Sequence, residues 1–200
     1  MIDKLIQIDV DLFLYLNNLG VESWDPFWLF ITSPIASIPV YLFVLILLYK
    51  YYGLKQTLLI LVGIGIMIGL SDQTSNLFKY GFERLRPCHN PNLEGIMRQV
   101  KSSCGGYYSF FSAHASTSMA IALVSALFVR KQAYWTARLL IVWALLVGYS
   151  RIYLGVHYPF DVLFGIEVGV VYATIIYNVL MIIIVKSKYF EYKMFNDRDI

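Results

Sequence analysis

The chain has 200 residues, which corresponds to one domain on a prior of about 150 residues per domain. Hydrophobic residues make up 58% of it and charged residues 14%, whereas a soluble domain carries about 25% charged residues. This composition excludes a disordered chain and a soluble globular domain, because neither can hide so much apolar surface. The formal net charge is +3 and the basic residues are scattered, which excludes a nucleic-acid-binding patch. We therefore expect an integral membrane protein.

The N-terminal segment, residues 1–25, is predicted to be an interfacial helix. Acidic side chains interrupt the apolar stretch that a cleaved signal peptide needs: Asp3, Asp9 and Asp11. Mixed with the apolar side chains of residues 5–16, they are typical of an amphipathic helix that lies at the membrane surface. An aromatic group that suits headgroup depth follows: Trp24, Phe27 and Trp28.

Apolar runs further along predict transmembrane helices, since about 20 mostly apolar residues cross the hydrocarbon core. In chain order they lie near residues 34–50, 58–78, 102–129, 137–152 and 159–185. The second run turns polar at residues 71–76, so that end must face protein or water. The expected fold is an all-α integral membrane bundle of about five transmembrane helices, with six as the alternative. Residues 1–200 are expected to form one membrane domain.

Basic residues near the ends of the spans predict the orientation. They lie between the first two spans, between the third and fourth, and in the tail 186–200: Lys50, Lys55, Arg130, Lys131, Lys186 and Lys188. The positive-inside rule makes this face cytoplasmic and the loop 80–110 external. In a bacterium this corresponds to the inner membrane, with that loop in the periplasm.

Three groups of polar residues fall at span ends that alternation of direction brings to the external face. The groups are Lys79, Arg86 and Pro87; Ser112, Ala113 and His114; and Ser150, Arg151, His157 and Asp161. Such a set fits chemistry on a phosphate ester. Cations with hydroxyl or amide donors hold the anion, one histidine attacks, and a second protonates the leaving oxygen.

These groups resemble the motifs of the type 2 phosphatidic acid phosphatases, which share an active site with vanadium haloperoxidases. The pattern Lys-x6-Arg-Pro is complete at residues 79–87, and Ser-Arg-x5-His-x3-Asp is complete at residues 150–161. The middle pattern, Pro-Ser-Gly-His, is half kept, because Phe111 and Ala113 replace its proline and glycine. Ala113 still has a backbone N–H for the phosphate, so we expect function to survive unless the site needs a conformation that glycine alone adopts.

The resemblance implies a role for each matching residue. His157 is expected to form a phosphohistidine, with Asp161 holding its ring in the attacking tautomer and His114 acting as general acid. The expected phosphate-binding residues are Lys79, Arg86, Ser112, Ala113, Ser150 and Arg151. Because the cations already supply positive charge, we expect no metal and no other cofactor. A zinc ion on the two histidines and Asp161, which these cations would repel, is the alternative.

Other polar residues of this face match no motif position. Arg84, Arg98 and Lys101 are expected to face solvent or headgroups, and His89 to be an ordinary loop residue. Asp72 lies two helical turns before Lys79 and is expected to support it, whereas Glu167 has no assigned role.

The chain has two cysteines, Cys88 and Cys104, in the same external loop between the first two motifs. An oxidising periplasm permits a disulfide between them, which is the preferred prediction. The alternative is a pair of free thiols in a reducing compartment.

Together these observations predict a membrane lipid phosphatase that acts on a phosphate or pyrophosphate monoester. Undecaprenyl diphosphate is the preferred substrate, because a pocket at the outer face suits carrier-lipid recycling. Lipid A and phosphatidylglycerophosphate are the alternatives. A non-catalytic transporter or scaffold that binds anionic lipids is an alternative of another class, although binding alone needs no nucleophile such as His157. A haloperoxidase is less favoured, because those relatives are soluble.

Overall fold

Helices make up most of the chain that the computed structural model describes, which is residues 2–101 and 103–196, with side chains up to residue 187. The long elements are α1 (Ile2–Asn18), α2 (Asp25–Ile31), α3 (Pro34–Phe82), α4 (Ala113–Val129), α5 (Tyr134–Tyr153) and α6 (Pro159–Asn196). Three short 3-10 helices accompany them: η1 (Glu22–Trp24), η2 (Pro87–His89) and η3 (Pro91–Leu93). The predicted tail 186–200 belongs to the end of α6 as far as residue 196, and its last four residues, 197–200, lie outside the described residues.

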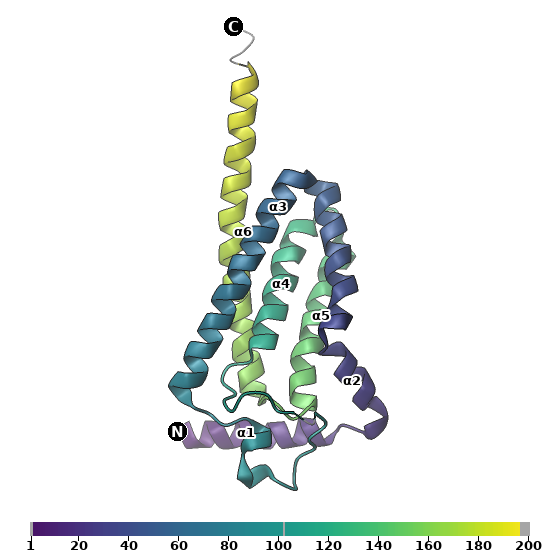
Figure 1. The fold of residues 1–200 in the computed structure, drawn as a ribbon, viewed down its shortest axis with the longest axis vertical. Coiled ribbons are helices and arrows are strands. Elements are labelled where there is room, and N and C mark those ends of the chain that lie inside the picture. The colour runs from purple at the N-terminus through teal and green to yellow at the C-terminus, as the bar shows by residue number, and fades with distance from the viewer. Residues whose placement is uncertain (1, 102, 197–200) are drawn as a thin grey trace.

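Helix α3 is a hairpin of two helical arms. Gly53 interrupts its helical dihedral angles with φ 73° and ψ 176°, and the chain reverses direction near the upper end of the bundle (Figure 1). Glycine is the residue that enters this region without steric cost, because it has no Cβ. The two arms correspond to the first two predicted spans.

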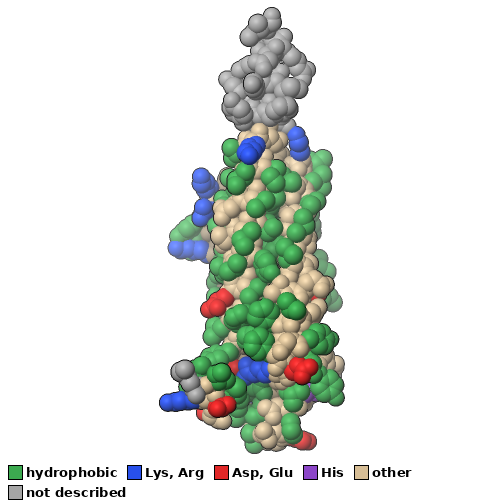
Figure 2. All heavy atoms as spheres, turned by 90° about the vertical axis from the view of Figure 1, so that its left-hand side faces the viewer, with side chains coloured by type: hydrophobic (Ala, Val, Ile, Leu, Met, Phe, Trp, Pro, Cys, Tyr) green, Lys and Arg blue, Asp and Glu red, His purple; other side chains and the backbone are tan. Residues whose placement is uncertain are grey.

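The helices have the length and polarity of a membrane bundle. By length and composition, α3, α5 and residues 159–187 of α6 can each cross a membrane, and α4 is a shorter apolar helix. With α3 counted as two arms, five helical segments run along the bundle within the described residues, which confirms the predicted all-α membrane fold (Figure 1). Figure 2 shows apolar side chains along the shaft and charged ones mainly toward its two ends. This distribution suits a hydrocarbon core.

The third predicted span, 102–129, is longer than the helix that the structure contains. Helix α4 begins at Ala113, after Ser112 caps it by accepting a hydrogen bond from the Ala115 amide at 3.4 Å. The preceding residues run over the end of the bundle and pair with the segment after α3 through an isolated antiparallel bridge between Leu85 and Tyr108. The predicted span was too long because residues 103–112 carry no charge, although they form a loop.

Helix α4 lies at the centre of the bundle and packs chiefly on α5 and α6. Two glycines of α6 allow a close approach: a Cβ on Gly165 would lie 2.6 Å from the Ser112 carbonyl oxygen, and one on Gly169 would lie 2.5 Å from that of Ser116. This is the contact between small residues four apart that is common in membrane helix pairs. It brings the N-terminal ends of α4 and α6 together.

Helix α1 lies across the lower end of the bundle, roughly perpendicular to the other helices (Figure 1). Its buried residues are Asp9, Phe13 and Asn17, which are four apart and share one face. Phe13 packs edge-on against Tyr158 with 5.4 Å between ring centroids, and the Asn17 amide donates to the carbonyl oxygens at the end of α5. Apolar side chains on the rest of the helix are exposed, as suits an interfacial helix: Leu5, Ile6, Ile8 and Leu12.

Candidate active site

The three sequence motifs meet at the end of the bundle that α1 covers. Lys79 is on the last turn of α3, His114 is on the first turn of α4, and Arg151 is on the last turn of α5. His157 lies in the turn between α5 and α6, and Asp161 lies in the first turn of α6. A 3.0 Å hydrogen bond from the Ser112 amide to the Asp161 carbonyl oxygen ties the second motif to the third.

A cleft of about 620 Å³ opens at this end of the bundle beside the first arm of α3. Four motif residues line it: Lys79, Arg86, Ala113 and His114. The rest of its wall is part polar and part apolar: Thr32, Ser33, Pro34, Ser37, Ile38, Tyr41, Asp72, Thr117, Ser118, Ile121 and Val147. Asp72 and Lys79 therefore share one cavity, as their helical spacing predicts.

His157 and Asp161 are the most deeply buried ionisable pair of this region, at 2% and 0% exposure of their side chains. Their Nδ1 and Oδ2 atoms are 3.5 Å apart, which is longer than a hydrogen bond, so the carboxylate flanks the ring. Asp161 is held by other groups: Oδ2 accepts from the Tyr158 amide at 2.9 Å and Oδ1 accepts from Arg84 Nη1 at 3.1 Å. The Nδ1 atom of His157 has no hydrogen-bond partner among the residues that the structure describes.

Positive charge surrounds the two histidines. Burial and the nearby charges of Arg151 and Arg86 hold the pKa of His157 well below its usual range. The imidazole is therefore neutral at physiological pH, which is the form that has a free electron pair for attack. The hydrogen bond from the Ser112 amide to the Asp161 carbonyl holds the first turn of α4, which carries His114, against the turn that carries Asp161.

Two arginines of the motifs are fixed by neighbouring oxygens. Arg86 donates from Nε to the Tyr108 carbonyl at 3.1 Å and from Nη1 to the Cys104 carbonyl at 2.5 Å. Arg151 is 3% exposed and donates from Nη1 to the Thr32 hydroxyl at 2.6 Å, while its buried Nε atom has no hydrogen-bond partner within the described part of the chain. A buried donor without a partner is costly, so this N–H is available to an anion.

The N-terminal end of α4 can add further donors. The helix has 17 residues and begins at Ala113, so its first amides lie at the positive end of the helix dipole. Ser112 is fully buried, and its oxygen accepts from Ala115, which leaves the hydroxyl hydrogen to donate. Cations, amides and two imidazoles together can hold a phosphoryl group and exchange it.

Ser150 has a different partner from the predicted one. Its hydroxyl donates to the Val147 carbonyl within α5 at 2.6 Å, so its hydrogen is not directed to a phosphate. A serine inside a helix commonly returns its hydroxyl to a carbonyl of the preceding turn. Phosphate binding by Ser150, which stays a prediction, would require this hydroxyl to change its partner.

Comparison with known proteins identifies the family of this chain. The model of the PAP2 superfamily matches residues 56–183. The chain belongs to the PAP2 superfamily. It is 33% identical over 171 residues to a lipid A 4'-phosphatase of Bacteroides thetaiotaomicron, covering 84% of this chain and 75% of that protein. It is 30% identical over 183 residues to a lipid A 4'-phosphatase of Porphyromonas gingivalis, covering 90% of this chain and 75% of that protein.

Solved structures of the PAP2 superfamily share the fold. Aquifex aeolicus LpxE superposes with a TM-score of 0.64 at 24% identity, over 84% of this chain and 93% of that one. A PAP2-type phosphatidylglycerolphosphate phosphatase of Bacillus subtilis superposes with a TM-score of 0.67 at 22% identity, over 88% of this chain and 86% of that one. This chain is therefore a membrane lipid phosphatase of the PAP2 superfamily.

The prediction that Arg84 and Arg98 face solvent or headgroups is wrong. Arg84 Nη2 lies 2.7 Å from Asp9 Oδ2, its Nη1 contacts Asp161, and its guanidinium carbon lies 3.9 Å from the Tyr158 ring centroid. Arg98 pairs with Asp25 at 3.0 Å. Outside its three motifs, this PAP2 protein therefore uses charged residues that motif matching does not reveal. One sequence feature indicates a buried polar face on the N-terminal helix. Asp9, Phe13 and Asn17 are spaced four residues apart and therefore lie on the same side of that helix.

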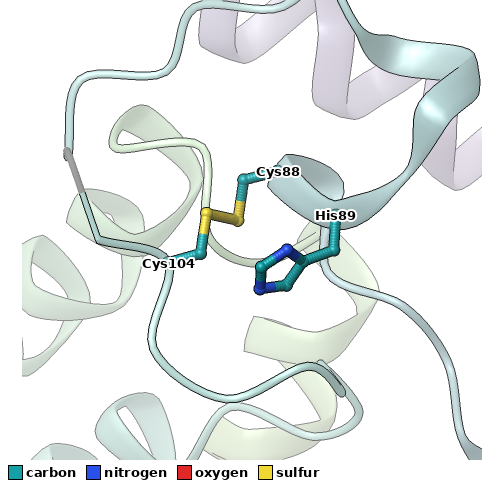
Figure 3. Close-up of side chains that lie close together, drawn as sticks. All are labelled: Cys88, His89 and Cys104. Atoms are coloured by element: carbon teal, nitrogen blue, oxygen red, sulfur yellow. A yellow bond between two sulfur atoms is a disulfide. The ribbon is translucent and has the colours of Figure 1, made fainter.

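A disulfide joins Cys88 in η2 to Cys104 in the segment before α4, as Figure 3 shows. His89 lies beside it and stacks on Tyr107 with 4.6 Å between ring centroids. Within the described ranges, the ligand atoms of Cys88, His89 and Cys104 lie within 4.8 Å of one another. Both sulfurs are bonded to each other and offer no thiolate to a metal. Because Arg86 donates to the Cys104 carbonyl, the disulfide also supports Arg86, one of the predicted phosphate-binding residues.

Proposed function

We propose that this protein hydrolyses the 4'-phosphate ester of lipid A through a phosphohistidine on His157. The observation that carries the proposal is the cleft, whose lining combines two cations and His114 with other polar and apolar side chains. Hydroxyl and carboxylate groups of Ser37, Tyr41 and Asp72 suit a sugar headgroup. Ile38, Ile121 and Val147 suit acyl chains.

The proposed substrate, lipid A, differs from undecaprenyl diphosphate, which the sequence analysis preferred. Undecaprenyl diphosphate has its phosphates directly on an isoprenoid chain and would leave the polar wall of the cleft without partners. Lipid A carries its phosphates on sugars. Two relatives at 33% and 30% identity are both named lipid A 4'-phosphatases, which supports the alternative of the sequence analysis over its preferred substrate.

The reaction runs in two steps. In the first, Nε2 of His157 attacks phosphorus, the P–N bond forms and the P–O bond to the sugar breaks, while His114 gives a proton to the leaving oxygen. In the second, His114 removes a proton from water, whose oxygen attacks phosphorus and breaks the P–N bond. Lys79, Arg86 and Arg151 stabilise the charge on the phosphoryl oxygens in both steps, without a metal.

The site faces the periplasm in this proposal, and the protein lies in the bacterial inner membrane. Exposed basic residues at the opposite end of the bundle support that orientation: Lys50, Lys55, Arg130, Lys131 and Lys186. The disulfide beside the site supports it independently, because disulfides persist in oxidising compartments.

The test is phosphate release by the purified protein in detergent micelles, with three lipids at equal concentration. These are lipid A, undecaprenyl diphosphate and phosphatidylglycerophosphate, with the His157→Ala variant as control. We expect lipid A to give the highest kcat/KM, and mass spectrometry to show loss of the 4'-phosphate. Preference for either other lipid would contradict the substrate, and release from none of them would contradict the activity.

A further inference from the structure

Asp9 is a fully buried carboxylate on helix α1, many of whose apolar side chains are exposed. Its Oδ2 atom lies 2.7 Å from Arg84 Nη2, and its Oδ1 atom accepts from the Phe160 amide at 2.8 Å. We propose that Asp9 is a positioning residue, through which the interfacial helix α1 sets Asp161 against His157. The proposal rests on the proposed function of that pair.

The first connection runs through one guanidinium. Arg84 uses Nη2 for Asp9 and Nη1 for Asp161 at 3.1 Å, so a single planar group bridges two carboxylates from α1 and α6. Its orientation is fixed further by the Tyr158 ring below it. A guanidinium held on both sides has little freedom to move, and the position of Asp161 follows from that of Asp9.

The second connection runs through the backbone. Helix α6 begins at Pro159, and the amides of a first helical turn have no partner within their own helix. Asp9 accepts from one of these amides, at Phe160, and therefore caps α6 from another helix. The turn that carries Asp161 is thus held at its side chain and at its backbone by the same carboxylate.

Asp9 itself stands apart from the substrate. It is fully buried, and it reaches Asp161 only through Arg84 and the backbone of α6. Its loss should therefore lower the rate of the chemical step without weakening lipid binding. Without the Asp9 charge, Arg84 would pair with Asp161 alone, which changes the position of the carboxylate beside His157.

The decisive variant is Asp9→Asn, which keeps an oxygen for the Phe160 amide and removes the charge that Arg84 needs. We expect kcat on lipid A to fall by about 100-fold, as small displacements of reacting groups do, with KM within about twofold. Asp9→Glu, which restores the carboxylate, should recover part of kcat. The matched control is Asp11→Asn, at an exposed acid on the same helix, which should retain wild-type kcat.

A double variant tests the coupling directly. If Asp9 acts through Arg84, then Asp9→Asn combined with Arg84→Gln should be little slower than Arg84→Gln alone. If the fold-loss of kcat in the double variant equals the product of the losses in the two single variants, the coupling is contradicted. A wild-type kcat in Asp9→Asn would also contradict it. Equal loss in Asp9→Asn and Asp9→Glu, with a lowered thermal midpoint, would reduce Asp9 to a structural role. Activity that survives His157→Ala would instead contradict the proposed function.

Discussion

The two ends of the bundle are held together by different interactions. At the end near Gly53, the arms of α3 pack on α4 and α6 through apolar contacts, such as the rings of Tyr52 and Tyr177 against Phe128. At the end covered by α1, buried polar side chains have specific partners: Asp9, Asn17, Ser112, Arg151 and Asp161. Apolar packing tolerates changes of similar volume, whereas a buried polar group depends on each partner. Substitutions should therefore reduce activity at one end and stability at the other.

The largest expected effect belongs to the polar end. His157→Ala removes the attacking atom, so phosphate release should fall by at least about 10⁴-fold. The variant should keep a thermal midpoint near that of the wild-type protein in the same detergent, because the turn around it is held by Asp161 and Arg84. A kcat within tenfold of wild type would remove His157 as nucleophile.

The disulfide lies in the loop of the same end and should matter for both properties. It joins two residues that are 16 positions apart in the sequence. In the chain-entropy account, closing such a loop stabilises the folded state by about 3 kcal/mol. We expect Cys88→Ser combined with Cys104→Ser to lower the thermal midpoint and to reduce kcat through the loosened Arg86. Adding a reductant to the wild-type protein should reproduce both changes, and its failure to affect either would contradict this role.

A substitution at the contact between α4 and α6 should lower the stability of the bundle. Gly169→Leu places a side chain where a Cβ would already lie 2.5 Å from the Ser116 carbonyl oxygen, and should cost about 1–3 kcal/mol through overpacking. The matched control is Leu139→Ala, at a side chain that is 65% exposed toward lipid, with an expected change within about 0.5 kcal/mol. Equal midpoints for these two variants would contradict the close packing of α4 on α6.

The smallest expected effect is that of a chelator. In the proposed mechanism Lys79, Arg86 and Arg151 supply the charge that a metal gives other phosphatases, so EDTA should leave kcat unchanged within error. Loss of activity that one added metal restores would require a metal ligand set in place of these cations. Inhibition by vanadate, a mimic of five-coordinate phosphorus, should occur with or without the chelator.

Local sequence patterns predicted the apolar helices of the bundle. They also singled out the motif residues at the end that α1 covers. Hydropathy located the helices, because burial in lipid requires continuous apolar runs. It overextended the third span, since residues 103–112 carry no charge although they lie outside α4. The fixed spacing of His157 and Asp161 sufficed to predict that they lie close together at the start of α6.

Contacts between distant residues could not be predicted in this way. Arg84 pairs with Asp161 across 77 positions, and Arg151 donates to Thr32 across 119. Helical periodicity gives the face on which a residue lies, but does not give the charge that it meets there. The buried role of Asp9 was hidden for a further reason, because an acid in an interfacial helix is ordinarily solvated.

The most direct test of the account is to trap the phosphoenzyme. Lipid A labelled with ³²P at the 4'-phosphate is mixed with wild-type protein, His114→Ala and His157→Ala, and the reaction is quenched in alkali, in which phosphohistidine survives. We predict label on the wild-type protein and on any His114→Ala protein that has completed the first step. Acid should release this label, and His157→Ala should carry none. Label on His157→Ala, or none on the wild-type protein during turnover, would contradict a phosphohistidine at His157.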